Sequence, residues 1–470
     1  MALLNGTRDR ERLRLLWQLG WPAIIEQILG TMVSYVDTAM VGSMGANGTA
    51  AVSVNGPALW LIGSAMMGIG VGYSVQVSNA VGAGDRERAK KITQQGFLAA
   101  LVSGLLALTI YEVLGGQISI WMGAKEEILP HAANYLRIYA AAYPFIAFQG
   151  LFSSVLRSMG NSRTPLVINT AANVGNAVLN FFLIYPTRQW HGITIYGVGW
   201  GVEGAALASA VAMSLGGLAT VWAAFHQAGY ETNLNREAMR PDRAIIRRAL
   251  KLGVPSAIEG SIINMGQIAM TTLVAHNLSI AALAANSVGN VAEGFCYLPA
   301  MGVGVATVAL VGQSVGAGSK EDAEGYGNLG GALAVGMTAV LSVILFIFAP
   351  NVLSIFNSDQ EVVTLAASAL RVMLVAEPLL AAASSYAGSL RGADDVKFPM
   401  YAGFIGMWVI RVPIAYFLVL VLHGDLMAVW FAMALDQGSR GILCFLRWKS
   451  KKWVHISGLD KEKARVQPAD

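Results

Sequence analysis

The sequence predicts an all-α membrane protein in which twelve transmembrane helices form two pseudo-symmetric six-helix lobes related by a parallel internal repeat. Apolar residues make up 55% of the chain and charged residues 13%, about half the charged share of a soluble domain. Stretches such as 166–185 and 331–350 are long enough, as helices, to cross the roughly 30 Å of a bilayer core. The motif VGAG occurs at Val81 and again at Val315, about half a chain apart.

Apolar runs separated by polar residues, glycine or proline predict the spans in order. We place them at 15–41, 51–79, 93–114, 132–156, 165–186, 202–226, 249–275, 284–312, 326–348, 363–390, 399–422 and 427–447. Helices are expected because backbone groups in lipid must bond internally. Cys296 and Cys444 both lie in apolar stretches, so neither a disulfide framework nor a metal site is expected.

Further matches at the same offset support the repeat. The segment "LRSMGNSRTP" (156–165) aligns with "LRGADDVKFP" (390–399), and "LGWPAIIE" (19–26) aligns with "LGVPSAIE" (252–259) after a one-residue slip. We therefore divide the chain into an N-lobe (1–225), a cytoplasmic linker (226–248), a C-lobe (249–447) and a cytoplasmic tail (448–470). Two parallel lobes enclose a cleft, and rocking about such a cleft gives alternating access. Transport is the predicted function.

Certain glycines and prolines of the repeat are candidates for turn or hinge positions. The VGAG motif lacks the following Lys and Ser or Thr of a phosphate loop, so its glycines are interpreted as a tight reversal after a helix. The turn and hinge candidates are Gly82, Gly84, Gly316, Gly318, Pro22 and Pro255.

The distribution of basic residues predicts the orientation. Most of the 32 lysine and arginine residues fall in the two termini and in loops on their side of the membrane. Both termini are therefore expected in the cytoplasm, and the chain in an inner or plasma membrane. The net charge of +4 is spread over short loops, so no nucleic-acid partner is expected.

Acidic residues inside the predicted spans are candidate functional groups, because a carboxylate is costly in lipid. Asp37 lies 15 residues after Pro22, or about 22 Å along the first helix. Glu26 precedes Asp37 by three helical turns, and Glu259 is its repeat partner. Glu26 and Glu259 are also compatible with packing or gating near the cytoplasmic end. Glu377 lies midway along the tenth span.

Four asparagines follow one face of the fifth span: Asn169, Asn173, Asn176 and Asn180. The repeat-related positions of the C-lobe are not asparagine. Amide groups beside a carboxylate can coordinate Na⁺ or bond a carboxyl group in either protonation state. The alternative is that these side chains only join helices. The predicted cation-coupling residues are Asp37, Asn176, Asn180, Asn173 and Glu26, with Na⁺ possible at the first three; Glu377 and Glu259 are secondary candidates.

The motifs "SYVDTAMVGSMG" (34–45), "GVEGAALAS" (201–209), "IRVPIAYFL" (410–418) and both VGAG turns resemble the multidrug and toxic compound extrusion (MATE) family. The resemblance covers nearly the whole chain. It implies a secondary antiporter that exports mostly cationic organic compounds in exchange for an inward cation.

The resemblance also bears on the coupling ion. In the DinF-like branch an Asp on the first helix pairs with Asn and Asp on the fifth; Asp37 and Asn176 match, whereas Asn180 replaces the Asp. In the NorM-like branch the Glu of the seventh helix falls at Ile263, whereas Glu259 lies only four residues after the proline. We therefore expect a bacterial-type, DinF-like site centred on Asp37, with H⁺ favoured over Na⁺.

Substrate contacts and partners complete the expectation. Tyr35, Tyr139 and Phe181 are candidates for lining an apolar substrate pocket, though each also fits ordinary packing. No cofactor is expected beyond the coupling ion, the partners are organic cations and the lipid bilayer, and a monomer suffices. A lipid- or oligosaccharide-linked flippase of related fold is the alternative. A membrane enzyme is disfavoured because no motif of catalytic spacing occurs.

Overall fold

The computed structural model describes residues 7–190, 193–234 and 240–460. Within these ranges it does not describe the side chains of Ser34, Tyr35, Thr38, Ala46, Trp190 and Ile193. The predicted pocket residue Tyr35 therefore lies outside the described side chains, as do parts of the predicted linker and tail.

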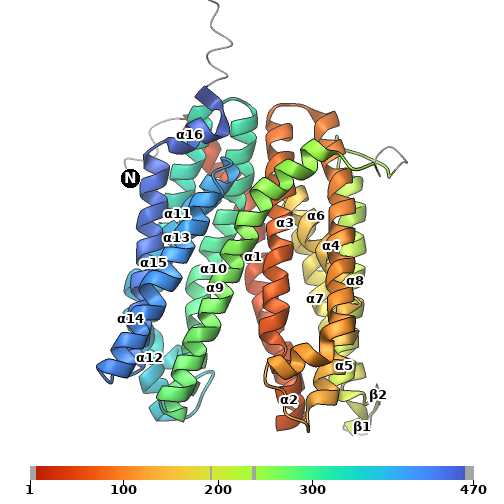
Figure 1. The fold of residues 1–470 in the computed structure, drawn as a ribbon, viewed down its shortest axis with the longest axis vertical. Coiled ribbons are helices and arrows are strands. Elements are labelled where there is room, and N and C mark those ends of the chain that lie inside the picture. Colours follow the sequence, from red (N-terminus) through yellow and green to blue (C-terminus); the bar gives the residue numbers. More distant parts are fainter. Residues whose placement is uncertain (1–6, 191–192, 235–239, 461–470) are drawn as a thin grey trace, which may run out of the picture. The chain divides into compact units, whose positions relative to one another are not determined.

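The described residues are almost entirely helical (Figure 1), which confirms the predicted all-helical class. The elements are α1 (Thr7–Gly42), α2 (Ala46–Ser53), α3 (Gly56–Gly82), α4 (Arg86–Trp121), α5 (Leu129–Ala140), α6 (Tyr143–Ser158), α7 (Arg163–Leu183), β1 (Pro186–Trp190), β2 (Ile193–Val198), α8 (Gly201–Phe225), α9 (Arg243–Asn277), α10 (Ile280–Gly316), α11 (Lys320–Leu353), α12 (Gln360–Gly392), α13 (Lys397–Phe404), the π-helical η1 (Ile405–Arg411), α14 (Val412–Tyr416), the π-helical η2 (Phe417–Val421), α15 (Leu426–Lys449) and α16 (Lys452–Ser457).

Eight of the described helices are long and apolar enough to cross a membrane, or nine if one bent pair counts as a single span. That pair is α5 and α6, which bend by 50° and together replace the predicted span 132–156. Pro144 is the second residue of α6. Because proline disfavours helical geometry in the residue before it and lacks an N–H, the helix is interrupted there.

Several helices begin earlier than their apolar runs predict. The reason is a Ser or Asp at the N-terminus whose side chain accepts a hydrogen bond from a backbone N–H of the first turn. These capping pairs are Ser279 with Ala282, Ser319 with Asp322, Asp359 with Glu361, and Asp425 with Met427. The caps extend α10, α11 and α12 into polar residues that a hydropathy window does not include.

The chain divides into two compact units. Unit 1 contains Met1–Gln27, Ser78–Asp85 and Pro255–Asp470; unit 2 contains Ile28–Val77 and Arg86–Val254. The helices α1 and α9 are each divided, with one part in each unit, near Pro22 in α1 and at Pro255 in α9. The lobe boundaries inferred from the sequence stay a prediction.

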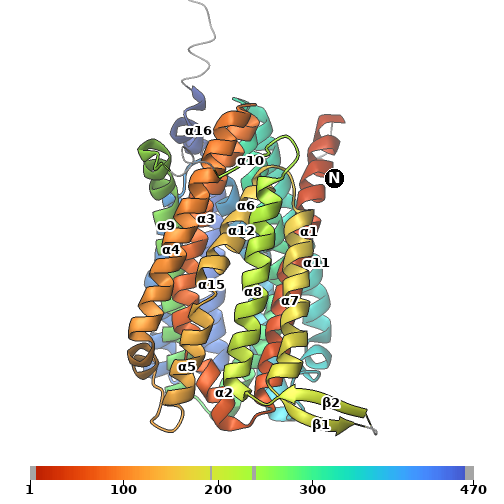
Figure 2. The same cartoon turned by 90° about the vertical axis from the view of Figure 1, so that its right-hand side faces the viewer.

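In unit 2, small residues bring helices into close contact. A Cβ atom at Gly217 of α8 would collide with the carbonyl oxygen of Phe145 in α6, and one at Gly104 of α4 would collide with Pro144. Glycine at such positions allows close helix approach in a membrane. The helices α7 and α8 run side by side (Figure 2), and the antiparallel hairpin of β1 and β2 connects them. This hairpin was not predicted from the sequence.

In unit 1, the core is formed mainly by α10, α12 and α15. Fully buried residues of this core include Ala292 in α10, Leu370 in α12 and Trp430 in α15. A Cβ atom at Gly441 of α15 would collide with the carbonyl oxygen of Leu379 in α12. The tight packing of these three helices determines which polar side chains meet inside the unit.

The two VGAG turns, both in unit 1, adopt equivalent conformations. Gly84 and Gly318 have φ angles of 71° and 70°, in the left-handed region that favours glycine. Gly82 ends α3 and Gly316 ends α10. A Cβ atom at Gly82 would collide with the backbone of Gln313, and one at Gly316 with the backbone of Asn79. The repeated glycines therefore permit both the reversal and a reciprocal contact between the repeat-related helix ends.

Candidate functional site

Asp37 lies in a hydrogen-bonded network formed by α1, α7 and α8 of unit 2. The amide nitrogen of Asn180 donates to the Asp37 Oδ1 at 2.7 Å and to the Asn176 Oδ1 at 3.2 Å. The amide nitrogen of Asn176 in turn lies 3.0 Å from the hydroxyl oxygen of Ser209 on α8. Asn176 and Asn180 are each 1% exposed. We call these four side chains the Asp37 network.

The asparagine stripe of α7 produces this arrangement. Residues spaced by four lie above one another on a helix face, so the amides of Asn176 and Asn180 form a continuous chain of hydrogen bonds that ends at the carboxylate of Asp37. Ser209 was not predicted. The sequence signal for it was weak, because a serine in a small-residue helix usually bonds its own backbone.

Two tyrosine rings of α5 are close enough to Asp37 to interact with its charge, and they continue into tyrosine rings of α4 and α6. The charge of Asp37 acts electrostatically on Tyr135 and Tyr139. Tyr139 packs edge to face with Tyr143, with ring centroids 6.0 Å apart, and Tyr143 stacks on Tyr111 at 5.1 Å. The predicted pocket residue Tyr139 thus belongs to an aromatic stack beside the carboxylate.

The other predicted members of this site lie elsewhere. The amide oxygen of Asn169 accepts a hydrogen bond from Gln149 on α6, as expected of a residue that joins helices. Asn173 is half-buried and is not part of the Asp37 network. The ring of Phe181 is covered by the guanidinium of Arg188, whose central carbon is 4.3 Å from the ring centroid.

Glu26 belongs to the part of α1 that lies in unit 1, whereas Asp37 lies in the part that belongs to unit 2. Eleven residues separate them, or about 16 Å along the helix. Glu26 is half-buried. It is therefore not a direct member of the Asp37 network.

Glu259 of α9 forms an ion pair with Arg391 of α12. The Arg391 NH2 lies 2.7 Å from the Glu259 Oε1, and the two side chains are 11% and 20% exposed for Glu259 and Arg391, respectively. Arg391 belongs to the repeated segment "LRGADDVKFP". A partner held this closely favours a structural role for Glu259 in joining α9 to α12.

Glu377 lies in a second buried cluster, in unit 1, most of which the sequence analysis missed. Its carboxyl group is fully buried and faces that of Glu293 on α10. The amide nitrogen of Gln437 on α15 donates to the Glu293 Oε1 at 3.3 Å. Two carboxyl groups in contact cannot both be ionised without a large cost, so this pair is suited to hold a proton.

Three further charged residues complete this group, which we call the Glu377 cluster. Asp436 and Arg440 on α15 form an ion pair at 2.8 Å, and the Arg411 NH1 at the end of η1 lies 3.9 Å from the Asp436 Oδ2. The sequence signal for Glu293 and Asp436 was present, as acids within apolar spans. The sequence analysis selected neither of them, although they lie in the predicted spans 284–312 and 427–447.

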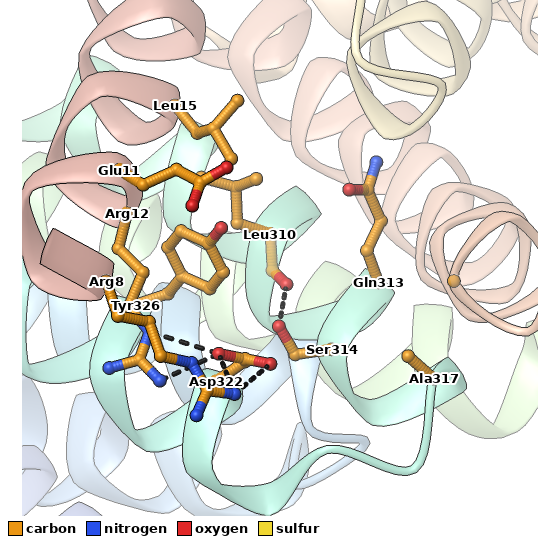
Figure 3. Close-up of a pocket in the computed structure, with 11 residues that line it drawn as sticks. Arg8, Glu11, Arg12, Leu15, Leu310, Gln313, Ser314, Ala317, Asp322 and Tyr326 are labelled. Atoms are coloured by element: carbon orange, nitrogen blue, oxygen red, sulfur yellow. Dashed lines mark hydrogen bonds and ion pairs between the residues drawn. The ribbon is translucent and has the colours of Figure 1, made fainter.

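A pocket in unit 1 lies beside the first turns of α1. It has a volume of about 400 Å³, and Arg8 and Arg12 of α1 reach the carboxylate of Asp322 on α11 across it (Figure 3). The Arg12 NH2 donates to the Asp322 Oδ1 at 2.7 Å and its NH1 donates to the Asp9 Oδ1 at 2.8 Å. Because these charges are paired with each other, the contacts attach the start of α1 to α11.

The polar contacts of Asp37 come from an amide donor. The amide nitrogen of Asn180 donates to both the Asp37 carboxylate and the Asn176 oxygen. In the described residues, no group of three or more His, Cys, Asp and Glu side chains is arranged to hold a metal ion. The geometry is that of a hydrogen-bonded carboxyl group.

Long apolar helices with carboxyl groups inside both helical units define a polytopic membrane protein. The sequence matches the MatE family over residues 22–182 and 255–417, which together make up most of the chain. The chain belongs to this family, known as MATE. It is therefore a membrane transporter and not an enzyme.

Relatives and solved structures agree with this assignment. The chain is 26% identical over 451 residues to a probable multidrug resistance protein NorM of Thermotoga maritima, covering 95% of this chain and 94% of the relative. It is also 26% identical over 441 residues to the transporter YisQ of Bacillus subtilis, covering 93% and 94%. A crystal structure of MATE in complex with MaL6 superimposes with a TM-score of 0.87 at 22% identity, covering 98% of each chain. An outward-facing multidrug resistance MATE transporter superimposes with a TM-score of 0.85 at 22% identity, covering 95% and 96%.

Proposed function

We propose that this protein is a multidrug exporter that moves organic, mostly cationic compounds out of the cell in exchange for inward protons. Relatives aligned over nearly their whole length are named as multidrug resistance proteins. The observation that carries the proposal is the hydrogen bond between Asn180 and Asp37, because it places a single ionisable group at the end of a chain of buried amides.

Proton exchange at Asp37 drives the proposed cycle. Protonation from outside neutralises Asp37 and weakens its charge-assisted bond to Asn180. The end of α1 then changes its contacts with α7, and the cationic substrate loses its attraction to the site and leaves outward. Release of the proton to the cytoplasm restores the charge, and Glu26 is the proposed relay along α1.

We favour H⁺ over Na⁺ as the coupling ion because of the hydrogen-bond donor that faces Asp37. Asn180 donates an N–H toward the carboxylate, which favours a proton carrier over an oxygen-coordinated metal ion. We therefore group the chain with the DinF-like branch, although Asn180 takes the place of an Asp. Tyr139, beside the carboxylate, is the proposed aromatic contact for the substrate cation.

The remaining proposals concern the membrane topology, the oligomeric state and the hinges of the protein. We propose twelve spans in an inner or plasma membrane, both termini in the cytoplasm on the basis of lysine and arginine placement, and function as a monomer. Pro22 and Pro255 lie near the positions where α1 and α9 pass between units, and they are the proposed hinges.

A flippase remains the alternative function. It would hold a diphosphate headgroup with arginine or lysine side chains that are available to it. Several of the arginines inside helices are engaged with protein groups. Arg391 and Arg440 are in ion pairs, and Arg371 bonds the carbonyl oxygen of Phe346. This arrangement favours a cation exporter.

The test uses proteoliposomes that contain the wild type, Asp37→Asn, or the control Glu126→Gln, which removes an exposed acid from the α4–α5 loop. Efflux of a fluorescent cation such as ethidium is followed under a pH gradient or a Na⁺ gradient, each imposed alone. We expect the wild type and Glu126→Gln to transport under the pH gradient, and Asp37→Asn to match protein-free vesicles. Transport driven only by Na⁺, or full activity of Asp37→Asn, contradicts the proposal.

A further inference from the structure

The Glu377 cluster has an unequal number of acidic and basic groups. The cluster contains three acidic residues, Glu293, Glu377 and Asp436, and two basic residues, Arg411 and Arg440. All five lie in unit 1. The thiol of Cys296 also interacts electrostatically with this pair of glutamates. With every acid ionised, the cluster carries one negative charge in excess. A net charge buried in a protein is costly, so the favoured state holds one proton between Glu293 and Glu377.

Arg440 and Arg411 differ in how closely they approach the carboxylate of Asp436. Arg440 pairs closely with Asp436: its Nε is 2.8 Å from the Asp436 Oδ1 and its NH2 donates to the Oδ2 at 3.0 Å. Arg411 is farther from that carboxylate, at 3.9 Å. Its NH2 donates to the sulfur of Met433 at 2.9 Å, a weak acceptor, and its Nε has no hydrogen-bond partner among the described residues.

The positive charge of Arg411 is therefore not neutralised by a close ion pair. Its guanidinium is 6% exposed and interacts electrostatically with Glu293 as well as with Asp436. Neither oxygen of Glu377 accepts a hydrogen bond from a basic or amide side chain of the described residues. The carboxyl group of Glu377, without a basic or amide donor, and Arg411, without a close carboxylate, thus lie in one buried cluster.

Local backbone geometry supports a specific role for Arg411. It is the last residue of η1, and π-helical segments are uncommon and occur frequently at functional sites. It also lines a polar cavity of about 20 Å³ together with Gln267, Asn286 and Asn290, which is room for about one water molecule. The guanidinium of Arg411 thus lies between this cavity, which three amide side chains line, and the carboxylate of Asp436 at 3.9 Å.

We propose that Arg411 is the built-in counter-cation of Glu293 and Glu377, and that it makes this cluster selective for protons by occupying the position of a metal cation. With Arg411 present, one proton balances the cluster. Without it, the carboxylates, the amide groups and the freed space form an oxygen-rich site that suits Na⁺. This inference deepens the proposed proton coupling by explaining why Na⁺ is rejected in the second half of the chain.

The test measures Na⁺ binding and not transport, so its failure is separate from failure of the exporter proposal. All variants carry Asp37→Asn to remove the other candidate site. Thermal unfolding and hydrogen–deuterium exchange of α10 and α12 are measured in detergent, in about 100 mM sodium chloride or choline chloride. The variants are Arg411→Gln, Arg411→Lys and Arg411→Gln combined with Glu377→Gln.

We expect no difference between the two salts when Arg411 or a lysine is present. For Arg411→Gln, Na⁺ should raise the melting temperature by about 2–4 °C and slow exchange in α10 and α12. Adding Glu377→Gln should abolish both effects. A Na⁺ response that depends on Glu377 while Arg411 is intact, or a folded Arg411→Gln that behaves alike in both salts, overturns the proposal.

If Arg411→Gln does not fold in choline chloride, the variant that combines Arg411→Gln with Glu377→Gln shows whether the charge or the packing of Arg411 is responsible. If Arg411 acts as a counter-cation, Na⁺ or the additional Glu377→Gln change restores the folded state, since either one restores the charge balance. If neither does, Arg411 is needed for packing and the proposal is wrong.

Discussion

Replacing Glu259 by Gln tests whether this acid is structural or takes part in coupling. The change removes the ion pair with Arg391, whose NH2 lies 2.7 Å from the Glu259 carboxylate, and leaves the guanidinium without its charge partner. Breaking a fully buried ion pair costs about 3–5 kcal/mol. Because one-fifth of the Arg391 side chain is exposed, we expect a smaller loss, of about 2–3 kcal/mol.

The measurement is a double-mutant cycle on the melting temperature in detergent, with Glu259→Gln, Arg391→Met and the combined variant. Each single change should lower the melting temperature by about 2–3 °C, because a chain of 470 residues has a large entropy of unfolding. The combined variant should lose less than the sum of the two, because neither charge is left unpaired, with a coupling energy of about 2 kcal/mol.

Transport at a temperature where all variants stay folded completes the experiment. If the pair is structural, Glu259→Gln retains proton-driven efflux there. The reasoning is refuted by a Glu259→Gln protein that melts like the wild type yet transports nothing, since the carboxylate would then act in the cycle itself.

Two further predictions concern the ends of the helices. Gly316→Ala places a Cβ atom against the backbone of Asn79 and should lower the melting temperature, whereas Gly336→Ala, in open space on α11, should be neutral or slightly stabilising. Asp242 caps the start of α9, and its hydrogen bond from Lys91 lowers the pKa of Asp242. The stabilisation is therefore complete above the ordinary aspartate pKa of about 4 and is lost as the pH falls through the lowered value. Hydrogen exchange in the first turn of α9 should increase over that acidic range, and Lys91→Met should shift the increase to higher pH.

The helical fold and part of the candidate site could be predicted from local patterns. Apolar runs predict helices because lipid leaves the backbone no other partner. The spacing of Asn176 and Asn180 indicated one polar face of α7, and the structure places that face against Asp37. Both inferences depend on a single helix or on its periodicity, which the sequence contains directly.

The Glu377 cluster could not be predicted because it depends on tertiary packing. Glu293, Glu377, Arg411 and Asp436 come from four different elements, and only the approach of α10, α12 and α15 brings them together. The hairpin of β1 and β2 was missed for another reason. Its strands are short, at five and six residues, and they lie between the predicted spans 165–186 and 202–226, where apolar runs give no signal.

The division of α1 between the two units determines the order in which the units can fold during synthesis. Unit 2 is complete once the chain has reached Val254, but unit 1 combines Met1–Gln27 with residues that begin at Pro255. At the usual rate of about 5–20 residues per second, the first part of α1 waits roughly ten to fifty seconds for its partners. Its arginines wait longer for Glu321 and Asp322, roughly 15 to 60 seconds at the same rate. A truncation that stops before α11 therefore leaves the basic start of α1 without Glu321 and Asp322, its acidic partners.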